Sequence, residues 1–214
     1  MVLIQIDDSG SGSLIGGTCI GAMRKETGEY HYEIIPMELY RPDIFDKKVY
    51  LDHAVEISKS LLEKLNVSKE EKIEICRGYM FDKVRLWLKD YHYHFISTSI
   101  GEPLQTVVES TFESYAVSLG LPKQFLSYTK YPFHFHRLLR WVYADYENRY
   151  ILCKTGWKSW KKYGALPVST SYRVLKKSNY RCLKCGQPIE KDSTAKVLKY
   201  ISNRPNIIYL HDQC

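Results

Sequence analysis

Two adjacent acids near the start of the chain, Asp7 and Asp8, are the first residues whose types and spacing suggest chemistry. They end an apolar strand expected over residues 2–7, and the glycine-rich turn of residues 10–17 follows them. Carboxylates at the end of a buried strand are costly unless a positive charge compensates them. Divalent cations with oxygen ligands are the usual compensation. The pattern therefore predicts a metal site for phosphoryl transfer on a β-hairpin.

Two other interpretations of this segment need weighing. Asp, Ser and Gly are turn residues, so Asp7 to Gly10 is also compatible with an ordinary turn. Residues 10–16 approach the G-x-G-x-x-G pattern of dinucleotide-binding proteins, but that pattern must open a helix. Here an apolar, β-branched run at residues 18–20 follows instead. The sequence favours the metal site over dinucleotide binding and leaves the turn open as an alternative.

A second candidate site lies at the other end of the sequence, where Cys182 and Cys185 form C-x-x-C and His211 and Cys214 form H-x-x-C. Four such ligands in two close pairs suit a closed, tetrahedral, structural Zn²⁺ site. A redox dithiol would account for the first pair but not for the second. Residues 179–186 are similar to the zinc knuckle of treble-clef and HNH modules. The His-His pair of HNH nucleases is absent, so we expect a zinc ribbon or truncated treble clef without its own catalysis.

Charge is distributed unevenly along the 214 residues, although the net charge is +7. Residues 1–120 hold 19 acidic and 13 basic side chains, whereas residues 121–214 hold 18 basic and 5 acidic ones. An acidic part suits cations and a basic part suits a polyanion. Aromatic residues interleave with Lys and Arg between residues 123 and 179, which favours nucleic acid as the partner. No apolar run is long enough for a membrane span, and the six cysteines suit a reducing, cytoplasmic location.

The elements that must position these residues can be read from the apolar periodicity. We expect strands over residues 2–7, 16–24, 30–40, 72–76 and 94–100, and helices over residues 46–65, 81–91 and 103–119. The order β-β-β-α-β-α-β-α predicts an α/β fold with a mixed sheet and helices on its faces. This order is similar to the ribonuclease H-like fold, and the resemblance covers about residues 1–120.

The first strand sharpens the resemblance. Residues 7–16 resemble the D-E-A-G-R-G-P-L-A-G motif of type 2 ribonucleases H, with Asp8 in place of Glu and Ser11 in place of Arg. In that family the loop contacts the ribose at an RNA–DNA junction, so the missing arginine puts that specificity in doubt. The strand is also similar to the G-I-D-P-G-S start of RuvC-type resolvases. Both resemblances imply that Asp7 is the first ligand of a catalytic Mg²⁺ or Mn²⁺.

Two-metal nucleases need three or four converging acids. Glu74, within the strand of residues 72–76, resembles the strand-four glutamate of RuvC-type enzymes. The last ligand is expected from Glu109 or Glu102, with Glu109 favoured slightly, while Glu113 is expected to face solvent. Further ligands on the first helix would be Asp52 or Glu56.

The sequence therefore predicts three parts: a catalytic domain at residues 1–122, a basic aromatic-rich region at 123–178 and a zinc-binding module at 179–214. The function expected is divalent-metal-dependent cleavage of phosphodiesters in RNA–DNA hybrid or branched, structured DNA. The alternative is a non-catalytic nucleic-acid-binding protein on a degenerate ribonuclease H-like fold. An actin-like phosphotransferase begins with a similar hairpin, but it needs two such domains, for which 214 residues are too few.

Overall fold

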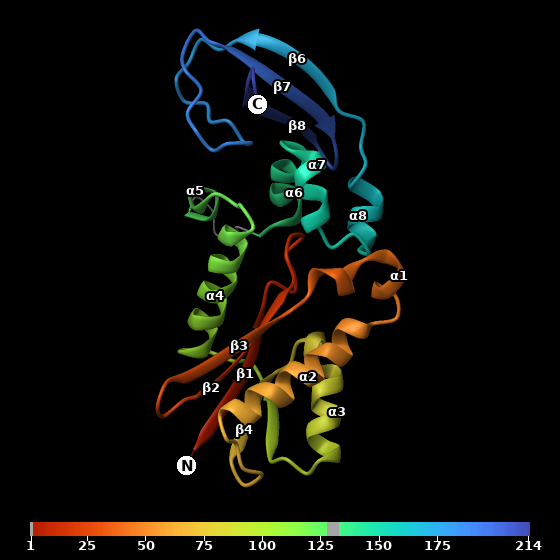
Figure 1. The fold of residues 1–214 in the computed structure, drawn as a ribbon, viewed down its shortest axis with the longest axis vertical. Coiled ribbons are helices and arrows are strands. Elements are labelled where there is room, and N and C mark those ends of the chain that lie inside the picture. The colour runs from red at the N-terminus through yellow and green to blue at the C-terminus, as the bar shows by residue number, and fades with distance from the viewer. Residues whose placement is uncertain (1, 128–132) are drawn as a thin grey trace. The chain divides into compact units, whose positions relative to one another are not determined.

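The computed structural model describes residues 2–127 and 133–214, which divide into two compact units (Figure 1). Unit 1 comprises residues 1–12 and 16–119, and unit 2 comprises residues 13–15 and 120–214. The short segment 13–15 belongs to unit 2 because Ile15 forms a β-bridge with Cys153. The two C-terminal parts that the sequence separates at residue 178 both lie within unit 2.

Unit 1 is built on a five-stranded sheet with the order β3-β2-β1-β4-β5. Its strands are β1 (Leu3–Ser9), β2 (Thr18–Arg24), β3 (Glu29–Ile35), β4 (Lys72–Cys76) and β5 (Phe95–Thr98). The first three strands are antiparallel, and β1, β4 and β5 run parallel. This is the topology of the ribonuclease H-like fold, so the expected fold class and the central position of the first strand are confirmed.

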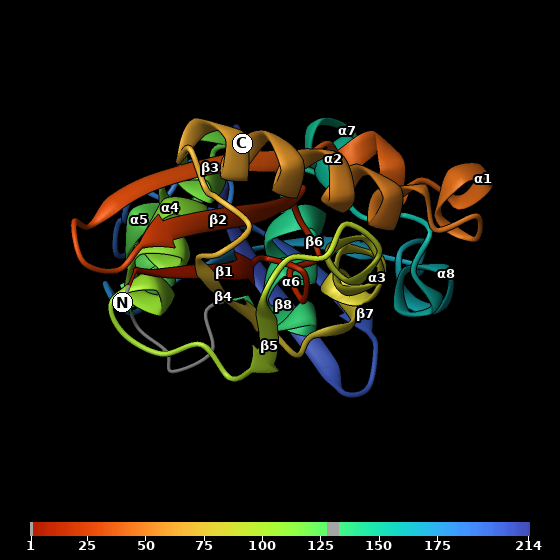
Figure 2. The same ribbon diagram turned by 90° about the horizontal axis from the view of Figure 1, so that it is seen from below.

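Helices cover both faces of this sheet (Figures 1 and 2). The helical elements of unit 1 are η1 (Met37–Tyr40), α1 (Pro42–Phe45), α2 (Val49–Lys64), η2 (Tyr79–Phe81), α3 (Asp82–Asp90) and α4 (Leu104–Ser118). Helices α2 and α3 bury one face together with Ile4 and Ile6 of β1. Helix α4 packs against β1 and β2. Because side chains alternate along a strand, Gln5 and Asp7 face the side opposite to Ile4 and Ile6.

Two expected elements differ from the structure by three residues or more at one end. The strand expected to continue to residue 40 ends at Ile35, because Pro36 cannot donate a ladder hydrogen bond and a 3₁₀ turn follows. The helix expected from residue 46 begins at Val49, since Lys48 adopts a left-handed backbone conformation with φ of 56°. The buried stripe of Leu51, Val55 and Leu62 on α2 follows the helical period as expected.

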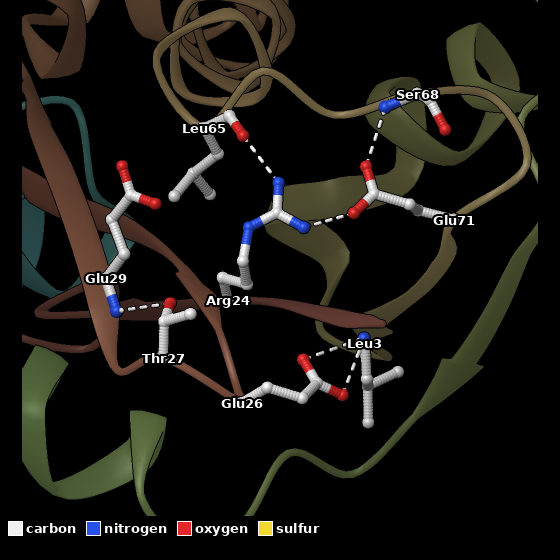
Figure 3. A network of polar contacts seen from close by, with 8 residues as sticks. All are labelled: Leu3, Arg24, Glu26, Thr27, Glu29, Leu65, Ser68 and Glu71. Atoms are coloured by element: carbon white, nitrogen blue, oxygen red, sulfur yellow. Dashed lines mark hydrogen bonds and ion pairs between the residues drawn. The ribbon is translucent and has the colours of Figure 1, made fainter. Parts of the chain in front are cut away.

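A polar network fixes the end of the sheet where β1 begins (Figure 3). The Arg24 guanidinium, at the end of β2, forms an ion pair with Glu71 and donates to the carbonyl of Leu65. The carboxylate of Glu71 also accepts from the backbone N–H of Ser68, at 2.7 Å. These contacts join the end of β2 to the loop between α2 and β4, and thereby support the pairing of β1 with both neighbours.

Unit 2 combines short helices with a three-stranded antiparallel sheet of order β6-β7-β8. Its elements are α5 (Lys123–Ser127), α6 (Phe135–Tyr143), α7 (Tyr146–Arg149), η3 (Tyr150–Leu152), α8 (Lys158–Tyr163), β6 (Ser169–Val174), β7 (Thr194–Ile201) and β8 (Pro205–His211). Residues 128–132, which belong to the predicted basic aromatic-rich region, lie outside the described residues. Trp141 of α6 is 1 % exposed and fills the core of this unit.

Within the described ranges, no helix has the length and apolar character that crossing a membrane requires. All six cysteines lie in these ranges and are free thiols.

Candidate metal centres

Asp7 and Asp8 lie at the carboxyl end of β1, the central strand of the sheet in unit 1. Asp7 pairs with Gly21 and Asp8 with Ile20 in the antiparallel ladder with β2. Asp7 is buried, at 9 % exposure, and Asp8 is half-buried. The fold thus places both carboxylates where a ribonuclease H-like site is expected, and the Asp7 carboxylate is largely removed from water.

The third member of this cluster is Cys76, the last residue of β4. Ile6 of β1 pairs with Ile75 of β4 in a parallel ladder, so the next residues on the two strands, Asp7 and Cys76, follow at the same end of the sheet. One carboxylate oxygen of each aspartate and the Cys76 sulfur all lie within 4.8 Å of one another. The sequence analysis did not single out Cys76, and we name this group the Asp7 cluster.

The electrostatics of the Asp7 cluster follow from burial. Burial raises the pKa of Asp7, and the charge of Glu109 adds to this, while hydrogen bonds from the Cys76 thiol and the Asp8 backbone N–H oppose it. The Asp8 N–H donates to Oδ1 of Asp7 at 2.9 Å. Burial and the two nearby aspartates raise the pKa of Cys76 to about 11. Negative charge at this position is therefore unfavourable without a cation.

Two glycines shape the surroundings of the Asp7 cluster: one allows close packing on α4, and the other leaves space beside the cluster. Gly10 has φ of +85°, and a Cβ on it would lie 2.1 Å from a ring carbon of Phe112 in α4. The turn after β1 therefore packs directly on α4, which only glycine permits. At Gly78, a Cβ would lie 3.6 Å from the Cys76 sulfur and 3.7 Å from Oδ1 of Asp8. The missing side chain leaves room for a ligand beside these two atoms.

The glutamates expected to complete the site lie outside the Asp7 cluster. Glu74 shares a face of β4 with Cys76 but pairs with Gln5, whose Nε2 donates to its carboxylate at 3.0 Å. Lys72 lies 3.9 Å from the same carboxylate. Glu74 is thus one alternating position further from the strand end than Cys76, and its role as a ligand stays a prediction.

Glu109 and Glu102 lie in and just before α4, and both are exposed. Glu109 accepts a hydrogen bond from Gln105 at 3.1 Å, and Glu102 accepts one from Thr106 at 2.6 Å. Of the two, Glu109 is close enough for its charge to raise the pKa of Asp7. The choice of Glu109 over Glu102 as the last ligand stays a prediction.

The remaining acids are spread over other surfaces. Asp52 and Glu56 of α2 pair with Lys83 and Lys59, respectively. Glu113 is exposed on α4.

The second candidate centre lies in unit 2, where Cys182, Cys185, His211 and Cys214 offer ligand atoms within 4.8 Å of one another. Nδ1 of His211 lies 3.3 Å from the Cys185 sulfur and 3.8 Å from the Cys214 sulfur. The other ring nitrogen, Nε2, lies 2.9 Å from the Pro188 carbonyl oxygen, so it can donate there and leave Nδ1 free as a ligand. Three sulfurs and one imidazole nitrogen fit a tetrahedral zinc ion.

Local structure prepares this group for a cation. Gly186, with φ of +78°, closes the knuckle through its N–H, which donates to the Cys182 carbonyl at 2.8 Å. Burial alone would raise the pKa of Cys182, but the backbone N–H groups of Cys185, His211 and Lys184 lower it to about 7. The thiolate form that binds a metal is thereby favoured at this position.

Arg149 of α7 is 8 % exposed and holds the knuckle of residues 182–186 in place. Its guanidinium donates to the carbonyls of Trp141, Leu183 and Lys184 at 2.6–3.1 Å. It also stacks on the Trp141 ring, with 4.0 Å between the guanidinium carbon and the ring centroid. Sequence reasoning missed this role, because an arginine next to Asn148 and Tyr150 has no local pattern that indicates burial.

Comparison with protein-family models and with curated proteins finds no match to this sequence. The fold and the geometry of the two clusters therefore carry the functional argument.

Proposed function

We propose that this protein is a divalent-metal-dependent nuclease that cleaves phosphodiester bonds in RNA–DNA hybrid or structured DNA. One observation carries the proposal: Asp7 and Asp8 converge at the carboxyl end of the central strand of a ribonuclease H-like sheet. Their surroundings disfavour negative charge unless a cation is present.

The chemistry divides between the cation and the protein. A bound divalent cation lowers the pKa of a water molecule and stabilises the leaving oxygen of a phosphodiester. Asp7 and Asp8 would hold it, and Glu109, Glu102 and Glu74 are the further acids that the sequence predicts as ligands. The protein mainly orients these ligands on a rigid strand, as electrostatic stabilisation of phosphoryl transfer requires.

For unit 2 we propose a structural Zn²⁺ held by Cys182, Cys185, His211 and Cys214. The donor set and the prepared thiolate at Cys182 support this assignment. The excess of basic side chains over acidic ones in residues 121–214 supports nucleic-acid phosphates as the partner of this region.

Two observations favour the alternative of a non-catalytic binding protein. The strand position beside Asp7 carries a thiol, and Glu74 is engaged by Gln5 and Lys72. A degenerate site of this kind would retain nucleic-acid binding without cleavage.

Cleavage assays distinguish the two functions. Purified full-length protein is incubated with a labelled RNA–DNA hybrid and with a four-way DNA junction, each with Mg²⁺ or Mn²⁺. We expect cleavage that Asp7→Asn abolishes and that Asp43→Asn, an exposed acid on α1 of the same unit, leaves unchanged. Binding measured in parallel without metal should be similar in all three proteins and should weaken steeply with salt. Binding without cleavage under every condition would support the alternative.

A further inference from the structure

The Cys76 sulfur in the Asp7 cluster does not suit Mg²⁺, the cation that the fold implies. Mg²⁺ demands oxygen ligands and keeps its water molecules. Thiolate ligands instead select softer transition ions such as Zn²⁺. A cluster of two carboxylates and one thiol is therefore a mixed donor set, suited to a borderline divalent ion.

The position of the thiol is determined by the fold rather than by a flexible side chain. The parallel ladder of β1 and β4 brings the ends of the two strands together, and Cys76 is the last residue of β4. The Cys76 thiol already donates a hydrogen bond to the Asp7 carboxylate. A cation that replaces this proton would meet the sulfur and both carboxylates without a change of backbone register.

The Cys76 sulfur accepts a hydrogen bond from the Gly78 N–H at 3.4 Å, a contact that a metal-bound thiolate can keep. Glu74, the carboxylate that would supply an oxygen ligand from β4, is held two residues away by Gln5. Gly78 presents no side chain toward the Cys76 sulfur or Asp8. Two negative neighbours disfavour a free Cys76 thiolate, but a bound cation reverses that balance and deprotonates a coordinating thiol.

We propose that Cys76 is a metal ligand together with Asp7 and Asp8, and that this site holds a thiophilic divalent transition ion, of the Co²⁺ and Zn²⁺ class, in preference to Mg²⁺. The proposal rests on the proposed function, because it names the cation of the same site. Of the two ions expected from the sequence, it disfavours Mg²⁺ and keeps Mn²⁺ as a transition ion that this site binds less tightly than Co²⁺ or Zn²⁺.

The test uses Co²⁺ as the probe and the full-length, zinc-loaded protein. Co²⁺ binds nitrogen and sulfur sites less tightly than Zn²⁺, so it leaves the Cys182 centre occupied by zinc. Binding is followed by the sulfur-to-cobalt charge-transfer absorption and by calorimetric titration. Three variants are compared with the wild type: Cys76→Ala, Cys76→Asp, and Cys19→Ala, which removes a buried thiol of β2 in the same unit. Thermal unfolding confirms that each variant is folded.

We expect the wild type and Cys19→Ala to show the charge-transfer band, and Cys76→Ala to lack it. Loss of the ligand should weaken Co²⁺ binding at least as much as the roughly 10–100-fold that follows loss of an outer-shell partner. Cys76→Asp should lose the band and bind Mg²⁺ more tightly than the wild type does. A band that persists in Cys76→Ala, or wild-type Mg²⁺ binding as tight as Co²⁺ binding, would overturn the proposal.

The same measurements separate this proposal from the nuclease function. Co²⁺ bound through Cys76 in a protein that cleaves no substrate would refute the nuclease function and leave the metal assignment standing. Cleavage with Mg²⁺ that Cys76→Ala does not change would do the reverse.

Discussion

Gly10 offers the sharpest test of how the sheet and α4 position the Asp7 cluster. It follows β1 directly, in the turn that leads toward β2, and its φ of +85° is a conformation that other residues rarely adopt. A Cβ built on Gly10 would lie 2.1 Å from Cε2 of Phe112 and 2.4 Å from two further ring atoms. Phe112 is fully buried and cannot swing into solvent. Gly10→Ala should therefore strain both the backbone and the packing of α4.

The magnitude follows from these two contributions. A left-handed conformation costs a non-glycine residue about 1–2 kcal/mol, and inserting a methyl group into a packed site costs about 1–3 kcal/mol. We expect Gly10→Ala to lower the free energy of unfolding of unit 1 by roughly 2–5 kcal/mol, from a total that is typically about 5–15 kcal/mol. In a Phe112→Leu background the packing contribution should shrink, leaving about 1–2 kcal/mol from the backbone.

Native-state hydrogen exchange of the β1 and β2 amides measures the stability of unit 1 in the full-length protein. Gly12→Ala is the matched control, because no atom lies within 4 Å of the Cβ that alanine would add there and the φ of Gly12 is not positive. That control should change stability by less than about 0.5 kcal/mol. Equal, small effects of Gly10→Ala and Gly12→Ala would refute the packing of this turn on α4.

Three further predictions concern charge and metal. In the absence of divalent cations, Asp7→Asn should stabilise unit 1 at pH values above the raised pKa of Asp7. The reason is that the wild type loses stability as pH rises from the pKa of Asp7 in the unfolded chain to its higher pKa in the folded protein, at about 1.4 kcal/mol per unit of difference between the two pKa values. Chemical denaturation across a pH series measures this. Arg149→Met should destabilise unit 2 by about 3 kcal/mol or more, since three carbonyls lose a charged donor, and Arg149→Lys should not restore the loss. Deleting residues 211–214 should abolish zinc binding, which contributes on the order of 10 kcal/mol of folding free energy in small modules, and should therefore unfold the sheet of unit 2. Metal analysis measures the loss of zinc, and circular dichroism measures the loss of the sheet.

The fold of unit 1 was predictable because its signals are local. Alternation along β1, the helical stripe on α2 and the short apolar run of β4 each indicate their own element. A chain of three hairpin-connected strands followed by α/β alternation has few possible topologies. Pro36 and the left-handed Lys48 shifted element ends by a few residues without altering the order.

The composition of the Asp7 cluster was less predictable, because it depends on register between distant strands. Glu74 and Cys76 share one face of β4, so the sequence of that strand alone does not decide which of them lies beside Asp7. Glu74 was predicted because it is an acid inside the strand. In the structure Glu74 pairs with Gln5, so Cys76, two residues further along β4, lies at the strand end near Asp7. The available signal for Cys76 was that it is a polarisable residue at the end of the strand, on the same face as the acid Glu74.

The zinc ligands are a contrasting case. Their spacing in two close pairs indicates a common site whatever the intervening structure is, and the structure brings all four ligand atoms together. The sheet of unit 2, whose strand β8 ends at His211, was not predicted, because β6 precedes Cys182 and its pairing with β7 leaves no local pattern.

Anomalous diffraction from crystals grown with Mn²⁺ tests the central claim, that Asp7 and Asp8 hold a divalent cation. We predict a manganese peak at coordination distance, about 2.0–2.6 Å, from carboxylate oxygens of both residues, absent from crystals of Asp7→Asn. Zinc anomalous scattering at the Cys182 centre of the same crystals would verify the data. Well-diffracting crystals with the zinc peak but no manganese peak at Asp7 would contradict the account.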